Sequence, residues 1–333
     1  MTAIATPLLT GIPQLRPLNI MRDLPGVADL VEKCFADTMD VDGRNYIQQM
    51  RHAGQDNLFL RWASRAIETT SMPLSGYIWE ENGEIIGNVS LIPYHHARKK
   101  YYLIANVAVR PEYRKRGIGR ALTLAAMQNA KQRCAYQTWL HVRDDNPGAI
   151  DLYRSLGFVE YARQTSWQAK PGQNTNPGNP GILVTRRTAR DWPAQETWLR
   201  RLYPDLLNWY QPMPWNSLRP GFLPTLYRFM SEVDVRHWVA RTYNIPSAMV
   251  SCQVAAGHNN RLWVAVPEQE SGDVVTALLL HARCQLFRQD KLSLDFPAGQ
   301  YNAFIEAAGF HLHRTLLWMK NDETSPEENR KSI

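Results

Sequence analysis

A short basic stretch with two glycines is the part of the sequence best suited to binding a phosphate group. Arg114, Gly117 and Gly119 fit the pattern R-x-x-G-x-G. Further basic residues surround the glycines: Lys115, Arg116 and Arg120. Glycine lets the backbone approach a ligand closely because no side chain intervenes. A strand-like run precedes the stretch and a helical pattern follows it, so free N–H groups at the helix start would face a bound phosphate or pyrophosphate.

Two other interpretations of this stretch compete with a phosphate site. A basic helix N-terminus after a glycine turn has the same residues without any ligand, and a loop with two glycines does not by itself decide between the two. A dinucleotide site of the Rossmann type requires the pattern G-x-G-x-x-G. Leu122 stands where the third glycine would be, so a Rossmann site is disfavoured.

A second group of polar residues lies in and after the next strand-like run. His141 stands within that run, which extends from Thr138 to Val142. Asn146 lies at an Asn-Pro turn, Tyr153 on the short helix that follows, and Gly157 at the C-terminal stop of that helix. The glycine loop and this group, in this order, predict a place for a phosphate-bearing cofactor with a polar group near its reactive end.

Together the two regions resemble the GCN5-related N-acetyltransferase (GNAT) superfamily, in which R/Q-x-x-G-x-G/A holds the pyrophosphate of coenzyme A. The resemblance covers Leu15 to about Trp167 and includes both signature regions in the right order. It implies acetyl-CoA (coenzyme A) as the cofactor. It also implies that coenzyme A enters a gap between two strands that splay apart, one at Val107 and one at Leu140.

The resemblance assigns roles to individual residues. The backbone of one strand end should bind the pantetheine arm and polarise the thioester carbonyl: Val107, Ala108 and Val109. The pyrophosphate should be held by Arg114 and by the loop and helix start that follow it: Lys115, Arg116, Gly117, Ile118, Gly119 and Arg120. Asn146 should bind the pantetheine region, and Tyr153 should protonate the leaving thiolate.

The base that would accept a proton from an amine is not at its usual position. Many family members carry a glutamate on the strand before the glycine loop, where this chain has Ala105-Asn106. The segment 140–158 looks like the matching stretch of ribosomal-protein alanine N-acetyltransferases, which have a glutamate base at the position of His141. An imidazole titrates near neutrality, so we predict that His141 is the base. The alternative is a histidine on a half-buried strand face without a catalytic role.

The composition is that of a soluble globular protein, with 44% hydrophobic and 21% charged residues. The sequence contains no run of 18 apolar residues, so no membrane span is expected, and the N-terminus has no secretory signal pattern. The four cysteines are scattered without a C-x-x-C pair: Cys34, Cys134, Cys252 and Cys284. This spacing disfavours a zinc site and a disulfide framework, and it fits a reducing, cytoplasmic location.

The net charge of +7 raises the possibility of a nucleic-acid partner. A nucleic-acid-binding protein would typically show a long basic run or basic residues interleaved with aromatic ones. Neither pattern is present, so nucleic acid is an unlikely partner. A polyanionic cofactor and an ordinary basic surface account for the charge.

The second half of the chain repeats landmarks of the first. Arg22-Asp23-Leu24-Pro25 recurs as Arg190-Asp191-Trp192-Pro193, and Val107-Ala108-Val109 recurs as Val264-Ala265-Val266. The ending Gly157-Phe158 recurs as Gly309-Phe310. We therefore predict an internal duplication, against the alternative of two unrelated α/β domains with chance matches. Tandem arrangements of this kind are known in the superfamily, mycothiol synthase being one type.

The second copy lacks the residues that would bind the cofactor. Carboxylates replace the basic loop: Glu268, Glu270 and Asp273. They would repel a pyrophosphate. Counting back from the Gly-Phe pair, Ile305 stands in place of Tyr153 and Ala298 in place of Asn146. We expect a degenerate fold that supports, shapes or covers the active half.

The expected fold class is α/β with a mixed α+β sheet, built as two tandem GNAT-like acyl-CoA N-acyltransferase folds. The expected boundaries are a catalytic domain at 14–170, a linker at 171–182, a degenerate domain at 183–320 and a disordered tail at 321–333. Within the catalytic domain we expect a first helix at Leu24–Phe35, a hairpin around Asn82-Gly83 and a long helix at Gly117–Arg133.

The predicted function is that of an acetyl-CoA-dependent N-acetyltransferase, which transfers the acetyl group to an amine by direct attack in a ternary complex. The acceptor is an amine on a small molecule or a protein N-terminus, and the sequence does not choose between them. Two alternatives remain open. One is a non-enzymatic acyl-CoA-binding sensor or scaffold, and the other is an acyltransferase with a longer acyl donor.

Overall fold

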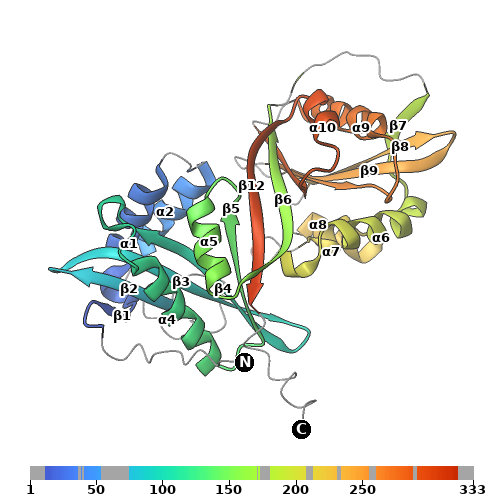
Figure 1. Cartoon of the computed structure of the whole chain (residues 1–333). Helices are drawn as coiled ribbons and strands as arrows, with labels where there is room; N and C mark the ends of the chain where they lie inside the picture. Colours follow the sequence, from blue (N-terminus) through green and yellow to red (C-terminus); the bar gives the residue numbers. More distant parts are fainter. Residues whose placement is uncertain are drawn as a thin grey trace, which may run out of the picture. The chain divides into compact units, whose positions relative to one another are not determined.

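The computed structural model describes residues 12–36, 39, 41–53, 75–170, 172, 181–207, 213–230, 234–254, 260–287 and 291–321. The chain forms two compact units (Figure 1). Unit 1 comprises Met1–Val142, Asn146–Tyr161 and Met319–Ile333, and unit 2 comprises Arg143–Asp145 and Ala162–Trp318. The expected boundary lies at residue 170, whereas the chain passes into unit 2 between Tyr161 and Ala162. The expected linker and tail lie almost wholly outside the described residues.

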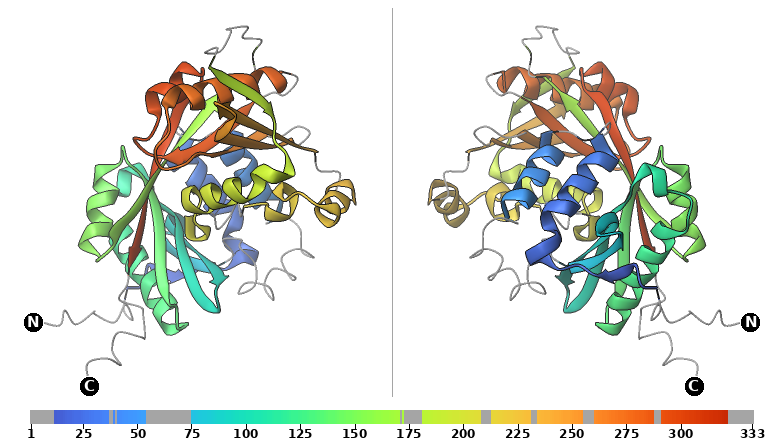
Figure 2. Two further views of the ribbon diagram at one scale, coloured as in Figure 1. Left: turned by 90° about the vertical axis from the view of Figure 1, so that its right-hand side faces the viewer. Right: turned by 90° about the vertical axis from the view of Figure 1, so that its left-hand side faces the viewer.

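Unit 1 is a sheet with helices on both faces. Its elements are β1 (Leu15–Pro17), α1 (Ile20–Phe35), α2 (Val41–Ala53), β2 (Ser75–Glu81), β3 (Glu84–His96), β4 (Lys99–Val109), the 3-10 turn η2 (Pro111–Tyr113), α4 (Ile118–Gln132), β5 (Gln137–Arg143), α5 (Pro147–Ser155) and the start of β6 (Val159–Ala169). The strand order is β1-β2-β3-β4-β5. The β1–β4 pairs are antiparallel, and β4 pairs with β5 in parallel. Figure 2 shows α1 and α2 (blue) and α4 and α5 (green) on opposite faces of these strands.

Unit 2 repeats this order of elements. They are β7 (Ile182–Arg186), η3 (Ala189–Asp191), α6 (Trp192–Leu202), η4 (Asp205–Leu207), α7 (Trp215–Leu218), α8 (Phe222–Met230), β8 (Asp234–Thr242), β9 (Ile245–Val254), β10 (Asn260–Ala265), α9 (Gly272–Gln285), β11 (Leu292–Pro297), α10 (Asn302–Ala307) and β12 (His311–Asn321). The strand order is β12-β6-β11-β10-β9-β8-β7, with β10 and β11 parallel. The predicted duplication of the fold is therefore confirmed.

The hairpin between β2 and β3 has the turn that its sequence predicts. Asn82 has φ 51° and Gly83 has φ 80°. Positive φ at both central residues defines the turn type that matches the twist of two antiparallel strands. The prediction of a hairpin at Asn82-Gly83 is confirmed.

The first helix begins four residues before the expected start at Leu24. Asn19 caps it, and its side chain accepts a hydrogen bond from the Met21 N–H at 3.0 Å. Pro25 lies inside the helix, where it removes one backbone hydrogen bond. Burial of the inward face offsets this loss, because α1 packs with α2, Ile78 and Ala108 in one apolar cluster.

The repeated Arg-Asp-x-Pro motif has a structural role in both units. The Asp23 carboxylate is 2% exposed and accepts hydrogen bonds from the Asn19 N–H at 2.8 Å and from both Nη atoms of Arg16 at 2.7 and 2.9 Å. Asp191, in unit 2, accepts from the Thr188 N–H at 2.8 Å and from Arg241 at 2.6 Å. Each aspartate thus fixes the entry to a helix and neutralises one arginine.

We expect Asp23→Asn to destabilise unit 1 by about 2 kcal/mol, because Arg16 loses its charged hydrogen bonds to the buried carboxylate and keeps only those to Glu80. Burial raises the pKa of the Asp23 carboxyl, but the hydrogen bonds and charge of Arg16 and the Asn19 N–H outweigh this effect and hold the pKa below its ordinary value. The stabilisation is therefore present above the unfolded pKa of about 3.9. It is lost as the pH falls through the lower folded-state pKa.

Urea unfolding at several pH values measures this effect. Asp29→Asn is the control, since Asp29 lies on the same helix and pairs with Arg51 at 2.7 Å, but it is 67% exposed. We expect a much smaller loss from the control. A wild-type advantage over Asp23→Asn that persists unchanged well below pH 4 would contradict the assignment.

Candidate functional site

Strands β4 and β5 pair over only part of their length. Their register runs from Tyr101↔Gln137 to Ile104↔Leu140. Both strands continue beyond the last pair, β4 to Val109 and β5 to Arg143. In the part of the chain that the structure describes, the register of β4 with β5 therefore ends before residues 105–109. This divergence lies where the resemblance implies that coenzyme A enters.

A β-bulge interrupts β4 at the point of divergence. Asn88 pairs with Ala108 and Ser90 pairs with Ala105, so two residues of β4, Asn106 and Val107, lie opposite one residue of β3. Asn106 has φ 51°, in the left-handed region. The extra residue interrupts the ladder at the start of the segment Val107–Val109, which the resemblance to the GNAT superfamily implies as the contact of the thioester carbonyl.

The glycine loop ends at the start of α4. Gly117 is the N-cap with φ 80°, and the first hydrogen bond of the helix runs from the Ala121 N–H to the Gly117 carbonyl at 3.0 Å. The N–H groups of Ile118, Gly119 and Arg120 precede that bond. A Cβ added at Gly117 would meet no atom within 4 Å. The helix therefore presents its free N–H groups in open space.

The basic residues around the loop have no carboxylate partners among the described residues. The Arg114 Nε donates to the Val109 carbonyl at 3.1 Å, the Arg116 Nη2 to the Glu112 carbonyl at 3.3 Å, and the Arg120 Nη1 to the Ser155 hydroxyl at 2.7 Å. All of these acceptors are neutral groups. The positive charge of the three arginines is therefore not neutralised by these contacts. Together with the positive end of α4, it is suited to a pyrophosphate.

Gly119 is not required by the packing of the protein itself. An added Cβ would lie 3.6 Å from Leu152 Cδ2 and 3.9 Å from Val109 Cγ2, which are ordinary contact distances. The helical backbone there does not need a glycine either, since position 119 lies inside α4. A glycine at this position would let a ligand approach the backbone closely.

Tyr153 is held by the ending of α5. The Phe158 N–H donates to the Tyr153 carbonyl at 3.1 Å and the Gly157 N–H to the Arg154 carbonyl at 3.0 Å, with Gly157 at φ 85°. This is the Schellman arrangement, in which the residues at the two ends of the motif pack together. The rings of Tyr153 and Phe158 meet edge to face at 6.1 Å.

The Tyr153 side chain is 6% exposed. Burial raises the pKa of its hydroxyl above the ordinary range for tyrosine. The group therefore keeps its proton throughout the neutral and mildly alkaline range, as a proton donor requires.

Asn146 has a structural function at the start of α5. Its Oδ1 accepts a hydrogen bond from the Ala149 N–H at 3.2 Å and caps α5. The cap uses the carboxamide oxygen of Asn146, and the carboxamide nitrogen takes no part in this hydrogen bond. Asn146 is exposed at the end of β5, close in sequence to the divergence from β4.

His141 lies on β5 just beyond the last residue paired with β4. The sequence predicts Trp139, His141 and Arg143 on one face of this strand. Trp139 is 1% exposed and packs edge to face on Tyr161 at 4.9 Å. His141 and Arg143 are partly exposed, and the Arg143 guanidinium binds Asp145 through two hydrogen bonds of 2.9 and 2.6 Å.

Two residues of the site were missed by sequence reasoning. Asn88 and Ser90 on β3 are 0% and 1% exposed, and both are hydrogen-bonded to Asn106 at the bulge. A signal was present, because two polar residues at alternate positions interrupt the apolar run from Ile85 to Ile92. The described side chains include no group of three His, Cys, Asp or Glu residues placed to hold a metal ion.

The counterpart of the glycine loop in unit 2 is built differently. The first residue of α9 is Gly272, and a Cβ added there would lie 2.1 Å from the Phe304 ring. The ring of Phe304 therefore covers the start of α9, whereas the start of α4 is open. The counterpart of the β4 bulge is also absent, since β9 and β10 pair in continuous register from Arg261↔Gln253 to Ala265↔Met249.

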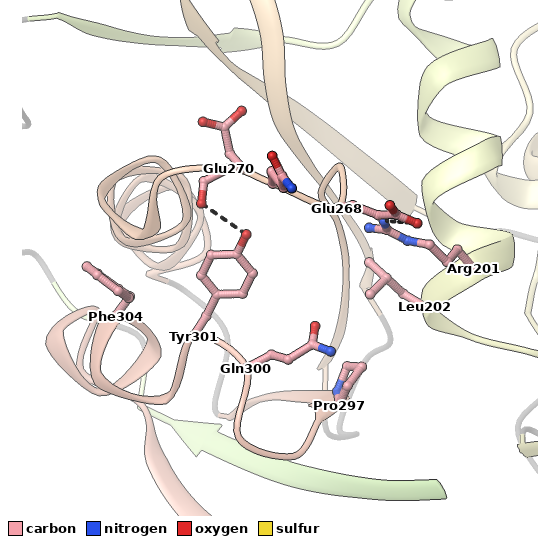
Figure 3. Close-up of a pocket in the computed structure, with 9 residues that line it drawn as sticks. Arg201, Leu202, Glu268, Glu270, Pro297, Gln300, Tyr301 and Phe304 are labelled. Carbon is pink, nitrogen blue, oxygen red and sulfur yellow. Dashed lines mark hydrogen bonds and ion pairs between the residues drawn. The ribbon is translucent and has the colours of Figure 1, made fainter. Parts of the chain in front are cut away.

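A cavity of about 590 Å³ remains beside this helix end (Figure 3). Glu268 and Glu270 line it, and the Tyr301 hydroxyl donates to the Glu270 carbonyl at 3.1 Å. Arg201 is the one basic residue in its lining, and its guanidinium is engaged by Glu268 at 3.4 Å and by the Val266 carbonyl at 2.6 Å. The cavity has none of the unpaired cations that surround the loop of unit 1.

Comparison with known proteins identifies relatives of unit 1. The model of the Acetyltransferase (GNAT) family matches residues 39–158. The [Ribosomal protein bS18]-alanine N-acetyltransferase of Escherichia coli K12 is 46% identical over 55 residues, which cover 16% of this chain and 37% of that protein. The mycothiol acetyltransferase of Thermobispora bispora is 46% identical over 55 residues, 16% of this chain and 19% of that protein. The matches thus span well under half of either relative.

Solved structures share the fold along nearly the whole chain. A GCN5-related N-acetyltransferase from Sphaerobacter thermophilus aligns with a TM-score of 0.58 at 15% identity, covering 95% of this chain and 97% of that one. A tandem GNAT protein from the clavulanic acid biosynthesis pathway aligns with a TM-score of 0.52 at 14% identity, covering 94% and 99%. The fold is therefore two tandem GNAT-like folds, and residues 39–158 within it match the model of the Acetyltransferase (GNAT) family.

Proposed function

We propose that the chain is an acetyl-CoA-dependent N-acetyltransferase whose donor site lies in unit 1. The observation that carries this proposal is the combination of an open helix start with unpaired cations at Arg114–Arg120 and a bulge at Asn106-Val107 where β4 leaves β5. The loop suits the pyrophosphate of coenzyme A. The backbone of Val107 to Val109 suits the pantetheine arm, which pairs with an exposed strand edge as an added strand would.

The reaction is direct attack of an amine on the thioester in a ternary complex. A hydrogen bond from the strand backbone to the thioester oxygen stabilises the negative charge that develops there. The leaving thiolate takes a proton, and Tyr153 is the proposed donor because its hydroxyl is protonated at neutral pH and sits on the helix after the second diverging strand. Asn146 positions this helix and is the proposed pantetheine contact.

The attacking amine must be neutral. A lysine-type amine with a pKa of about 10.4 is neutral in only about one molecule in two thousand at pH 7. A base near the acceptor therefore contributes most for amines of high pKa. His141 is the proposed base, acting directly or through water. Its position on β5 beyond the last paired residue and the absence of a carboxylate at Ala105-Asn106 support this role.

His141→Gln should slow transfer by about 100-fold for an amine of high pKa and by less for one that is largely neutral. In the wild type, kcat/KM should rise with pH through the neutral range. In His141→Gln this rise should be absent. His311→Gln is the control, since His311 is an exposed strand histidine of unit 2. Identical pH profiles for wild type and His141→Gln would assign the titration to the acceptor amine and exclude His141 as the base.

The names of two relatives support the proposed class of acceptor. One relative acetylates an alanine of ribosomal protein bS18, and another is a mycothiol acetyltransferase. We infer an amine on a protein N-terminus or on a small molecule as the acceptor here. None of the described helices is long and apolar enough to cross a membrane. All four cysteines are free thiols, which supports a reducing, cytoplasmic location.

The test is acetyl transfer by the full chain. Acetyl-CoA is mixed with a panel of N-terminal peptides, polyamines, aminoglycosides and amino sugars, and release of the coenzyme A thiol is followed. We expect acetyl-CoA-dependent release with at least one amine class. Binding of acetyl-CoA without turnover of any amine would favour a non-enzymatic sensor. Transfer from longer acyl-CoA donors but not from acetyl-CoA would indicate an acyltransferase with a longer acyl donor.

A further inference from the structure

We propose that Asn88 is a positioning residue for acyl transfer. It lies on β3, one strand away from the diverging pair, and its side chain holds the bulge in β4 so that the Val107 N–H faces the thioester oxygen of the bound donor. This inference rests on the proposed function, because it names a residue that prepares the same site.

The hydrogen bonds connect β3 to the bulge in two places. The Asn88 Nδ2 donates to the Asn106 carbonyl at 3.0 Å and to the Ser90 Oγ at 3.3 Å, and the Asn106 Nδ2 donates to the same Oγ at 3.3 Å. A backbone carbonyl accepts only, so the nitrogen of the Asn88 carboxamide must face Asn106. This requirement fixes the orientation of the Asn88 side chain.

The bond to the Asn106 carbonyl determines where the next N–H points. In a trans peptide the carbonyl of one residue and the N–H of the next point in opposite directions, and the described chain has no cis peptide bond. The Asn106 carbonyl faces Asn88 on β3. The Val107 N–H therefore points away from Asn88, and the pairing of β4 with β5, which ends at Ile104↔Leu140, does not extend to Val107.

The corresponding strands of unit 2 have no such bulge. β9 and β10 pair in continuous register through Trp263 and Val264, the residues that match Asn106 and Val107 in the repeat. In unit 2 the equivalent serine, Ser251, instead contacts Gln195 at 2.8 Å and His237 at 2.7 Å. The bulge is thus found in the unit with the basic glycine loop and not in its counterpart with the acidic one.

Stability alone does not account for an asparagine at this position. Asn88 is 0% exposed, and its Oδ1 has no hydrogen-bond partner among the described residues. A buried acceptor without a partner lowers stability. Leucine would fill a similar volume without that loss, so the benefit of the asparagine lies in the conformation that its nitrogen imposes on the bulge.

Isotope-edited infrared spectroscopy tests the proposal without knowledge of the acceptor. Acetyl-CoA carrying ¹³C at the carbonyl is bound to the full chain, and the carbonyl band is compared with that of free acetyl-CoA. A hydrogen bond to the thioester oxygen lowers the band frequency. We expect a lowered band in the wild type, loss of most of this shift in Asn88→Leu and partial loss in Ser90→Ala, with coenzyme A affinity by calorimetry unchanged.

Ser251→Ala is the matched control, since it removes a buried strand serine from unit 2, and we expect the full shift. The full shift in folded Asn88→Leu and Ser90→Ala would overturn the proposal. If Asn88→Leu does not fold, the shift of the carbonyl band in Ser90→Ala alone decides the question. Equal loss of coenzyme A affinity in Ser90→Ala and Ser251→Ala would indicate a structural role only and would also overturn it. Failure of the proposed function is distinct, because it would appear in the wild type itself, either as no binding of acetyl-CoA or as binding without acetyl transfer to any amine.

Discussion

Gly119→Glu is expected to lower acetyl-CoA affinity by about 100-fold or more, equivalent to about 2.8 kcal/mol. The substitution puts a carboxylate at the start of α4, where the free N–H groups and the unpaired cations of the loop would hold a pyrophosphate. Repulsion between like charges and the bulk of the side chain both oppose binding. Calorimetry with acetyl-CoA measures the loss.

Two further variants separate charge, size and folding in this result. Gly119→Ala adds a methyl group that the protein accommodates at 3.6 Å from Leu152, so we expect intact folding and a smaller loss of affinity. Gln132→Glu puts the same charge at the other, exposed end of α4, and we expect affinity close to that of the wild type. Wild-type affinity in Gly119→Glu would exclude the loop as the pyrophosphate site.

Tyr153→Phe is expected to lower kcat by about 10- to 1000-fold. The ring packing on Phe158 at 6.1 Å is kept, while the proposed proton donor to the leaving thiolate is removed. Acetyl-CoA affinity should change little, because the hydroxyl acts in the transition state rather than in binding. Steady-state kinetics with a competent amine, together with calorimetry, separate the two effects.

Tyr203→Phe is the matched control for this prediction. Tyr203 is a buried tyrosine of unit 2 whose hydroxyl accepts a hydrogen bond from the Val264 N–H at 3.1 Å. Its loss should lower stability and leave kcat unchanged. An unaltered kcat in Tyr153→Phe, with chemistry as the slow step, would mean that the thiolate departs without a proton from this residue.

Much of unit 1 was predictable because its signals are local. The Asn82-Gly83 turn requires positive φ at both residues and fixes the hairpin. The pair Gly157-Phe158 marks a Schellman ending that recurs at Gly309-Phe310, where the Phe310 N–H donates to the Ile305 carbonyl at 3.3 Å. The same type of helix ending therefore occurs at corresponding places in the backbone of both units, as a duplication predicts.

Other features depended on contacts that the local sequence does not record. The start of α1 at Ile20 rather than Leu24 follows from the cap at Asn19 and from burial against α2 and the sheet. The bulge at Asn106 is hydrogen-bonded to Asn88, which is 18 residues away along the chain. The repeat of Arg-Asp-x-Pro suggested duplication, but its capping role needs Arg16 and Arg241, which lie at unrelated distances from the motif.

The transition between the units was also beyond a sequence argument. The composition of residues 171–182 predicts a linker, which lies almost wholly outside the described residues. Strand β6 belongs to unit 2 from Ala162 onward and pairs with β11 from Gln164 onward. A strand pattern does not reveal which sheet it joins, because either partner would bury the same alternating side chains.

The number of acetyl-CoA molecules bound per chain tests the central claim most directly, namely that unit 1 holds the donor and unit 2 does not. Titration of the full chain by calorimetry should give one site, and Gly119→Glu should remove it. In unit 2 Phe304 covers Gly272, and Glu268 and Glu270 line the cavity beside it. Two equivalent sites in the wild type, or one site that survives in Gly119→Glu, would contradict the account.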